Sequence, residues 1–455
     1  MKAITKHLHG EGLRARAMRS SIWTVAGYGA SQVLRLGSNL ILTRLLFPEA
    51  FGMMALIMVF MQGLVMFSDI GVGPSIMQNK RGDDPDFLNT AWSIQVIRGF
   101  ILWLVACAIA VPLARFYEEP QLAQMIPVAG ITLLISGFNP TRLETAHRHL
   151  LLGRVSIINI ATQFVGAMAA IILALITHSV WAFVLSGVVS ISAQLYMYNR
   201  FLPGETNRFQ WDKSAAHELI TFGKWIFIST VAGFLFVQGD KLILGKFLTL
   251  DTLGVYNIGY FLASFPLLIS GTVIHKVLIP LYRERPPAAS AENYRKLRNM
   301  RFAVTGAIMC LLMVFAYMGV ALVDLLYDQR YQNAGPIVVL SACMQIPMII
   351  VLTYDQAALA SGDSKRFFVL AGTKATAMII ALLIGVQTAG LFGALISQGV
   401  AIIAVYPVVV WLARRQGAWD PVHDVLFAIA GILIATTAIW YNIDAIQHFK
   451  SLNFI

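Results

Sequence analysis

The stretch Leu40–Met53, LILTRLLFPEAFGM, returns without a gap as Leu242–Val255, LILGKFLTLDTLGV. Each copy joins the end of one long apolar segment to the start of the next. Such a repeat indicates two related halves of a membrane protein, each with an equivalent helical hairpin. The identical pairs are Leu40 and Leu242, Ile41 and Ile243, Leu42 and Leu244, Leu46 and Leu248, and Gly52 and Gly254.

The composition requires a bilayer as solvent. Of the 455 residues, 58% are hydrophobic and 13% charged, and the mean hydropathy is +0.70. Soluble domains carry about 25% charged residues. Because roughly 20 apolar helical residues cross the hydrocarbon core, thirteen segments predict an all-α membrane protein. They are Ile22–Thr43, Phe51–Phe67, Leu88–Val111, Leu122–Phe138, Val155–Ile176, Val180–Tyr198, Phe222–Leu242, Leu253–Ile279, Phe302–Leu326, Ile337–Ala360, Phe368–Val386, Leu391–Leu412 and Val425–Tyr441.

These segments and the repeat divide the chain into two lobes of six segments each. We expect an N-terminal lobe over residues 1–202, a cytoplasmic linker over 203–221 and a C-terminal lobe over 222–415. Residues 416–455 carry an additional hydrophobic segment. Internal repeats of this kind are typical of membrane transporters.

The net charge of +11 follows the topology and needs no nucleic-acid partner. Lys and Arg concentrate on the N-terminal side and on every second loop, so the positive-inside rule places the N-terminus in the cytoplasm. We therefore predict a multi-pass membrane protein with a cytoplasmic N-terminus. The opposite loops and the C-terminus hold only Arg44, Arg115, Lys241, Lys246, Arg330 and Lys450.

Several functions lack the residues that they need. The loops leave no room for a soluble catalytic domain, and there is no GxxxxGK[ST] phosphate loop, which excludes ATP hydrolysis by this chain. Asp83 and Asp84 stand among basic residues and predict a solvated loop rather than a catalytic metal pair. The three cysteines fall inside predicted spans and are expected to pack as small apolar residues, so we predict no metal site and no cofactor.

The first span carries a polar stripe. Six polar residues recur at steps of three and four, which gathers them on one face of a helix: Tyr28, Ser31, Gln32, Arg35, Ser38 and Asn39. At membrane depth such a face must turn toward protein or a water-filled cavity. Arg35 lies about 20 Å along this helix from its cytoplasmic start, and no acidic residue occupies the positions three or four away. We predict that it contacts an anion; a structural ion pair is the alternative.

The equivalent helix of the second half also carries polar groups. The repeat offset brings Asp240 and Lys241 to the level of the Ser38–Asn39 pair, so facing helices can line one central space. Asp240 and Lys241 either bind substrate or neutralise each other. Arg98 and Lys374 add positive charge within spans.

Two carboxylates inside spans are candidates for a coupling ion. Asp69 precedes a glycine-containing stretch, and Asp355 lies between Tyr354 and Gln356. Burial raises a carboxyl pKa toward the working range, so either could carry a proton or sodium ion. For Asp69 we favour a conformational joint.

Several runs resemble a known family. LTRLLFPEAFG at Leu42–Gly52 and FSDIGVG at Phe67–Gly73 are similar to the N-terminal signature of bacterial polysaccharide exporters, the oligosaccharide flippases of the multidrug/oligosaccharidyl-lipid/polysaccharide superfamily. The second-half runs DKLILGKFLTLDTLGVYNIGY at Asp240–Tyr260 and VLIPLY at Val277–Tyr282 look like the matching region. The resemblance covers roughly residues 20–412.

The resemblance implies 12–14 transmembrane helices in two six-helix lobes around a central cavity, in a bacterial inner membrane. It also implies alternating access and carriage of an undecaprenyl-pyrophosphate-linked oligosaccharide, with membrane lipids, a polysaccharide polymerase and export machinery as partners. Arg35, Arg98 and Lys374 then meet the pyrophosphate, and amides such as Gln32 and Asn39 meet the sugars.

Two other functions stay open. A drug/cation antiporter of the same superfamily would favour acidic cavity residues, against which Arg35 and Arg98 argue. A membrane-integral polysaccharide polymerase would need a long external loop with catalytic carboxylates or histidines, and the sequence contains none. We therefore predict a flippase that is not an enzyme, for exopolysaccharide or O-antigen-type glycan.

Overall fold

The protein is helical, as predicted. The computed structural model describes residues 13–69, 71–273, 278–360 and 364–452. The chain is 87% helical, and these ranges contain no strand. Eight described helices are each long and apolar enough to cross a membrane, or up to ten if each bent helix pair is one span. Twelve of the thirteen predicted segments each lie in a helix to within one residue at an end. The eighth is divided between the helices Leu250–Ala263 and Phe265–Val273 and then runs beyond the described residues.

The chain forms two compact units. The first contains residues 1–46 and 57–231, and the second contains residues 47–56 and 232–455. The helix α3 (Pro48–Phe67) therefore begins in the second unit and ends in the first, and α10 (Lys213–Phe247) passes from the first unit to the second after Val231. The linker predicted from the sequence, residues 203–221, lies before this point in the chain.

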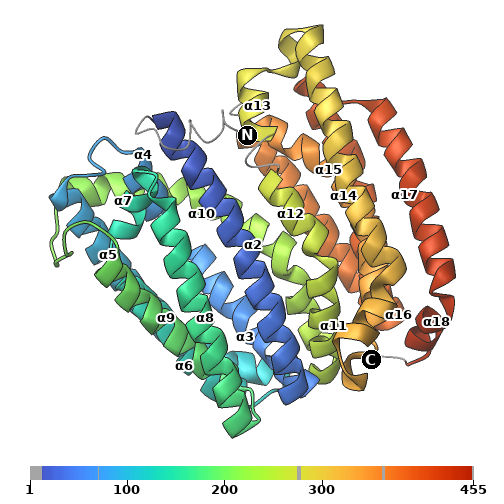
Figure 1. The fold of residues 1–455 in the computed structure, drawn as a ribbon, viewed down its shortest axis with the longest axis horizontal. Coiled ribbons are helices and arrows are strands. Elements are labelled where there is room, and N and C mark those ends of the chain that lie inside the picture. Colours follow the sequence, from blue (N-terminus) through green and yellow to red (C-terminus); the bar gives the residue numbers. More distant parts are fainter. Residues whose placement is uncertain (1–12, 70, 274–277, 361–363, 453–455) are drawn as a thin grey trace, which may run out of the picture. The chain divides into compact units, whose positions relative to one another are not determined.

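The first unit is built from helices that run alongside one another (Figure 1). In it α5 packs against α6, α8 packs against both α2 and α9, and α6 also packs against α9. The first turns of α10 pack on α4 and α5 through a core that includes Leu219, Ile76 and Phe87. Besides parts of α3 and α10, the unit contains α2 (Leu13–Leu45), α4 (Val72–Gln78), α5 (Pro85–Tyr117), α6 (Leu122–Gly137), α7 (Arg142–Arg148), α8 (Leu152–Thr177) and α9 (Trp181–Phe201).

The second unit is organised around α15, whose apolar span is 78% buried. This helix packs against α11, α13, α14, α16, α17 and α18 (Figure 1). The unit also contains the additional C-terminal segment predicted from the sequence. Its elements are α11 (Leu250–Ala263), α12 (Phe265–Val273), α13 (Ile279–Glu284), η2 (Pro287–Ala289), α14 (Ala291–Leu326), η3 (Gln329–Tyr331), α15 (Ala334–Ala360), α16 (Ser364–Arg415), α17 (Pro421–Tyr441) and α18 (Ile443–Ser451).

Local sequence sets where these helices begin and break. Asp84 caps α5, with its carboxylate accepting from the backbone N–H of Asp86, and Pro85 opens the helix. Thr249 caps α11 in the same way through its hydroxyl. The helix α16 contains two predicted spans joined at Gly390, whose φ of 57° suits glycine. The pair α11–α12 bends by 49°.

Candidate functional site

In the polar stripe of α2, some residues pack against a neighbouring helix and others are exposed. The Ser31 hydroxyl lies 2.5 Å from Oε1 of Gln163, whose Nε2 donates to the Ser31 carbonyl at 3.1 Å. This part of the stripe therefore joins α2 to α8 and is not available to a ligand. Arg35, one turn further along, is exposed at its side chain. An arginine that faces lipid deep in a membrane is costly, and the predicted cavity beside α2 stays a prediction.

Gln32 and Asn39, the two predicted amides of this helix, are both partly buried. The buried Oε1 atom of Gln32 has no hydrogen-bond partner among the described residues. Buried polar atoms normally find a partner. Gln32 can therefore accept a further hydrogen bond from water or a ligand beside Arg35.

In this conformation the Arg98 side chain is bonded to another part of the protein. Its Nε donates to the Ser68 hydroxyl at 2.9 Å and its second terminal nitrogen donates to the carbonyl of Val65 at 2.7 Å. Both partners lie at the end of α3, where helix carbonyls lack partners within the helix. A cation at a helix C-terminus is also favoured by the helix dipole. Arg98 therefore fixes the end of α3 to α5.

Asp69 follows this helix end and shapes the next turn. Its Oδ1 atom accepts from the backbone N–H of Gly71 at 2.8 Å, and Gly71 has a φ of 66°. The interpretation of Asp69 as a conformational joint stays a prediction. The other predicted coupling carboxylate, Asp355, lies in α15, but its side chain is outside the part of the chain that the structure describes.

In the second unit, Asp240 and Lys241 point to different partners. The Asp240 carboxylate accepts from the hydroxyl of Tyr256 at 2.5 Å, and this hydroxyl also accepts from Nε2 of Gln398 at 3.2 Å. Lys241 donates to Oε1 of Gln238 at 2.9 Å. Asp240 and Lys241 therefore make separate hydrogen bonds, and both interpretations of the pair stay predictions.

Aromatic residues of α11 complete this cluster, and sequence reasoning did not select them. The rings of Tyr256 and Tyr260 stack with centroids 5.7 Å apart, and Nζ of Lys241 lies 5.5 Å from the centre of the Tyr260 ring. The sequence repeat could have pointed to them, because it aligns these two tyrosines with the apolar Met54 and Met58 of the first half. Lys374, on α16, is only 5% exposed and is not accessible to a ligand in this conformation.

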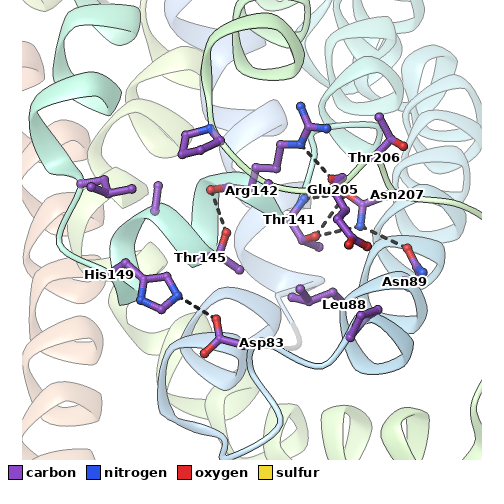
Figure 2. Close-up of a pocket in the computed structure, with 15 residues that line it drawn as sticks. Asp83, Leu88, Asn89, Thr141, Arg142, Thr145, His149, Glu205, Thr206 and Asn207 are labelled. Carbon is purple, nitrogen blue, oxygen red and sulfur yellow. Dashed lines mark hydrogen bonds and ion pairs between the residues drawn. The ribbon is translucent and has the colours of Figure 1, made fainter.

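A pocket of about 360 Å³ lies at one end of the first unit (Figure 2). Most of its polar groups bond to one another. Nε2 of His149 lies 2.8 Å from Asp83, and Nδ2 of Asn207 donates to the Thr141 hydroxyl at 2.8 Å. Arg142 donates to the carbonyl of Glu205 at 2.8 Å. The predicted linker thus forms one wall of the pocket and is held against the first unit.

Ion pairs continue this attachment outside the membrane. Arg81 lies 2.9 Å from both Asp84 and Asp212. The hydrogen bond and charge of Arg81 hold the pKa of Asp212 below its ordinary value. For Asp83, partial burial raises the pKa, but hydrogen bonds and charge from His149 and Arg148 outweigh it and leave the pKa lowered. The expected solvated loop is thus exposed but ordered by ion pairs.

Each unit therefore holds its own group of predicted residues. Arg35, Gln32 and Asn39 share one helix of the first unit, where Arg98 makes separate contacts. Asp240 and Lys241 occupy a buried cluster of the second unit. A single site formed by groups from both halves stays a prediction.

The fold is shared with membrane transporters. The protein superposes on the lipid II flippase MurJ in its inward closed conformation over 95% of this chain and 98% of that chain, with a TM-score of 0.69 and 10% identity. It also resembles an inward-facing multidrug resistance MATE family transporter of the MOP superfamily, with a TM-score of 0.61 and 13% identity over 85% of this chain and 95% of that one. This defines a multi-pass membrane protein with a transporter fold.

The chain belongs to the family described as polysaccharide biosynthesis protein, which matches residues 41–336. The teichuronic acid biosynthesis protein TuaB of Bacillus subtilis is 20% identical over 66% of this chain and 62% of its own length. The succinoglycan biosynthesis transport protein ExoT of Rhizobium meliloti is 22% identical over 57% of this chain and 52% of its own length. The matches thus span between half and two thirds of these relatives. The family resemblance and the all-α membrane fold predicted from the sequence are confirmed.

Proposed function

We propose that this protein is a flippase that carries an undecaprenyl-pyrophosphate-linked oligosaccharide from the cytoplasmic to the external leaflet. It serves export of an exopolysaccharide or O-antigen-type glycan by alternating access, and it is not an enzyme. A fold alone does not define function, so the proposal has two supports. The polysaccharide biosynthesis family supports a glycan as substrate, and the transporter fold supports movement across the membrane.

The observation that carries the proposal is the exposed Arg35 on the polar stripe of a membrane helix. Arginine binds phosphate oxygens through two parallel charge-assisted hydrogen bonds. Gln32, with its unpartnered oxygen, stands beside it to receive a sugar hydroxyl or a water. Arg98 and Lys374 add positive charge to the helices, although in this conformation Arg98 bonds the end of α3 and Lys374 is buried.

The orientation also belongs to the proposal. The charge pattern places the N-terminus in the cytoplasm. The pocket and ion pairs around Asp83 and Arg81 then lie at the cytoplasmic end of the first unit, where the lipid-linked precursor is made.

Deletion of the gene followed by lipid analysis tests this function. A flippase defect traps complete lipid-linked repeat units on the cytoplasmic leaflet, where an external glycan-modifying probe cannot reach them. If repeat units reach the outer face and remain unpolymerised, the protein acts as a polymerase and the proposal is wrong. If neither product accumulates and surface glycan is normal, the substrate is of another class.

A further inference from the structure

Four aromatic side chains gather at the end of the first unit where residues 202–212 join α9 to α10. The ring centroid of Phe209 lies 4.8 Å from that of Trp92, and Trp92 contacts the Phe138 ring edge-on at 6.2 Å. Trp211 follows Phe209 by two residues. Phe209 is 66% exposed, Trp211 54% and Phe138 37%, while Trp92 is partly buried. We call these four residues the aromatic patch. An exposed apolar patch marks a surface at which a protein meets a membrane or a partner.

The connecting segment presents this patch because its backbone is fixed to α5. The backbone N–H groups of Arg208, Gln210 and Asp212 donate to side-chain oxygens of α5 at 3.1, 3.0 and 3.0 Å. Every second N–H thus bonds the same helix, as in an extended chain, where successive side chains turn to opposite sides. Phe209 and Trp211 therefore share the outward side of the segment.

The helices beneath the patch set its level relative to the membrane. Trp92 lies four residues into the predicted span Leu88–Val111, which is about 6 Å along the helix. Phe138 directly follows α6, the next apolar helix. Because Phe209 packs on Trp92, the patch lies level with the ends of apolar spans and not in the water beyond them. Tryptophan is enriched at this boundary, since its ring is apolar and its N–H is polar.

We propose that the aromatic patch is a membrane contact, in which Phe209 and Trp211 insert among the lipid headgroups of the adjoining leaflet and hold residues 202–212 against it. Lys213, exposed at the start of α10, lies two residues beyond Trp211, where anionic lipids favour a cation. With the N-terminus in the cytoplasm, this leaflet is the cytoplasmic one. The contact is separate from the proposed substrate site and does not depend on transport.

The depth of a spin label tests the contact in the full chain. The three native cysteines are replaced by alanine, and one cysteine is introduced as Trp211→Cys or as the control Glu205→Cys. Glu205 is an exposed residue of the same segment that lines the pocket of Figure 2. Each labelled protein is placed in lipid nanodiscs without any other membrane protein. Oxygen concentrates in lipid and a nickel chelate in water, so each reagent reports one environment.

The label at position 211 should respond more to oxygen than to the nickel chelate, and the label at position 205 should show the reverse. The same nickel accessibility at both positions would place the segment in water and overturn the proposal. The nanodiscs contain no partner protein, so this result would leave the patch to a protein partner.

Tryptophan fluorescence gives a second measurement that keeps an aromatic ring at position 211. Wild type and Trp211→Phe are compared in nanodiscs whose lipids carry bromine near the headgroup end of the acyl chains, and in others brominated near the chain ends. Wild type should lose more emission than Trp211→Phe with the first lipid, and both should lose equally with the second. If the additional emission of wild type is quenched by iodide in the water and by neither lipid, Trp211 faces water and the proposal is wrong.

Discussion

Gly52 and Gly254, which are equivalent in the sequence repeat, lie against each other where α3 and α11 cross. A Cβ atom on Gly52 would stand 2.0 Å from the carbonyl oxygen of Leu250, and one on Gly254 would stand 1.9 Å from that of Pro48. Both distances are far below van der Waals contact, and both involve backbone atoms that a side-chain rotation cannot move. The glycine that both repeat copies share therefore allows the two helices to pack closely within the second unit.

Substitution at this crossing should destabilise the protein. Gly52→Ala or Gly254→Ala forces the two helix starts apart, and overpacking of this kind typically costs about 1–3 kcal/mol or more. We expect reduced membrane abundance and a lower unfolding temperature, measured by quantitative immunoblot and by thermal unfolding in detergent. Gly372→Ala is the control, since nothing lies within 4 Å of its new Cβ. Equal behaviour of all three variants would contradict the close crossing.

Arg35 should be required for export but not for folding. Arg35→Ala removes the exposed guanidinium and should abolish surface glycan at unchanged membrane abundance. Arg35→Lys should restore only part of the export because an ammonium cannot form two parallel bonds to a phosphate. Membrane level and surface glycan are measured together in both variants. Normal export in Arg35→Ala, or loss of export only in step with loss of protein, removes Arg35 from the substrate site.

Arg98 should behave in the opposite way. Arg98→Ala leaves the Val65 carbonyl and the Ser68 hydroxyl without their donor, and bonds to charged groups contribute about 1.5–3 kcal/mol each. We expect lower abundance and a lower unfolding temperature, with export per remaining molecule unchanged. An Arg98→Ala protein that is stable yet inactive would show that Arg98 binds substrate and would contradict its structural role.

The pair Arg81–Asp212 should give a pH-dependent contribution to stability. Because the folded pKa of Asp212 lies below its unfolded value of about 3.9, its stabilising effect is present above that pH. The effect is lost as the pH falls through the folded pKa. Arg81→Ala should therefore lower the unfolding temperature by a constant amount from pH 7 to about pH 5, and the difference should shrink as the pH falls below about 4 and through the lowered folded pKa.

The control for this series is Arg208→Ala, since Arg208 is an exposed cation of the same segment and its backbone N–H donates to Oδ1 of Asn89. It should unfold like wild type at every pH. A deficit in Arg81→Ala that persists unchanged in acid would mean that its contacts other than the carboxylate pairs cause the loss.

Reporter insertions test the orientation. A reporter after Glu119, between α5 and α6, or after Asp251, in the first turn of α11, should be external. A reporter between Arg285 and Ser290, between α13 and α14, should be cytoplasmic. Phosphatase and fluorescent reporters, which are each active on one side only, make the measurement. Reversed activities would invert the assignment of the Figure 2 pocket to the cytoplasm.

The sequence by itself determined the membrane environment, the helix positions and the family. The apolar runs are long and local, so every predicted span except the eighth lies in one helix. The repeat between Leu40–Met53 and Leu242–Val255 identified the related halves. The helical period also placed Arg35 and Gln32 on one face. These properties depend on residues close together in the chain, which is why they are readable without a structure.

Only the tertiary structure decided which neighbour each polar group received. The period of α2 could not tell that Ser31 bonds Gln163 while Arg35 stays exposed, nor that Arg98 binds the end of α3. The partner of Asp240 is Tyr256, sixteen residues away, and not the adjacent Lys241. Such choices depend on which helices pack together, and packing joins residues whose separation in sequence carries no local signal.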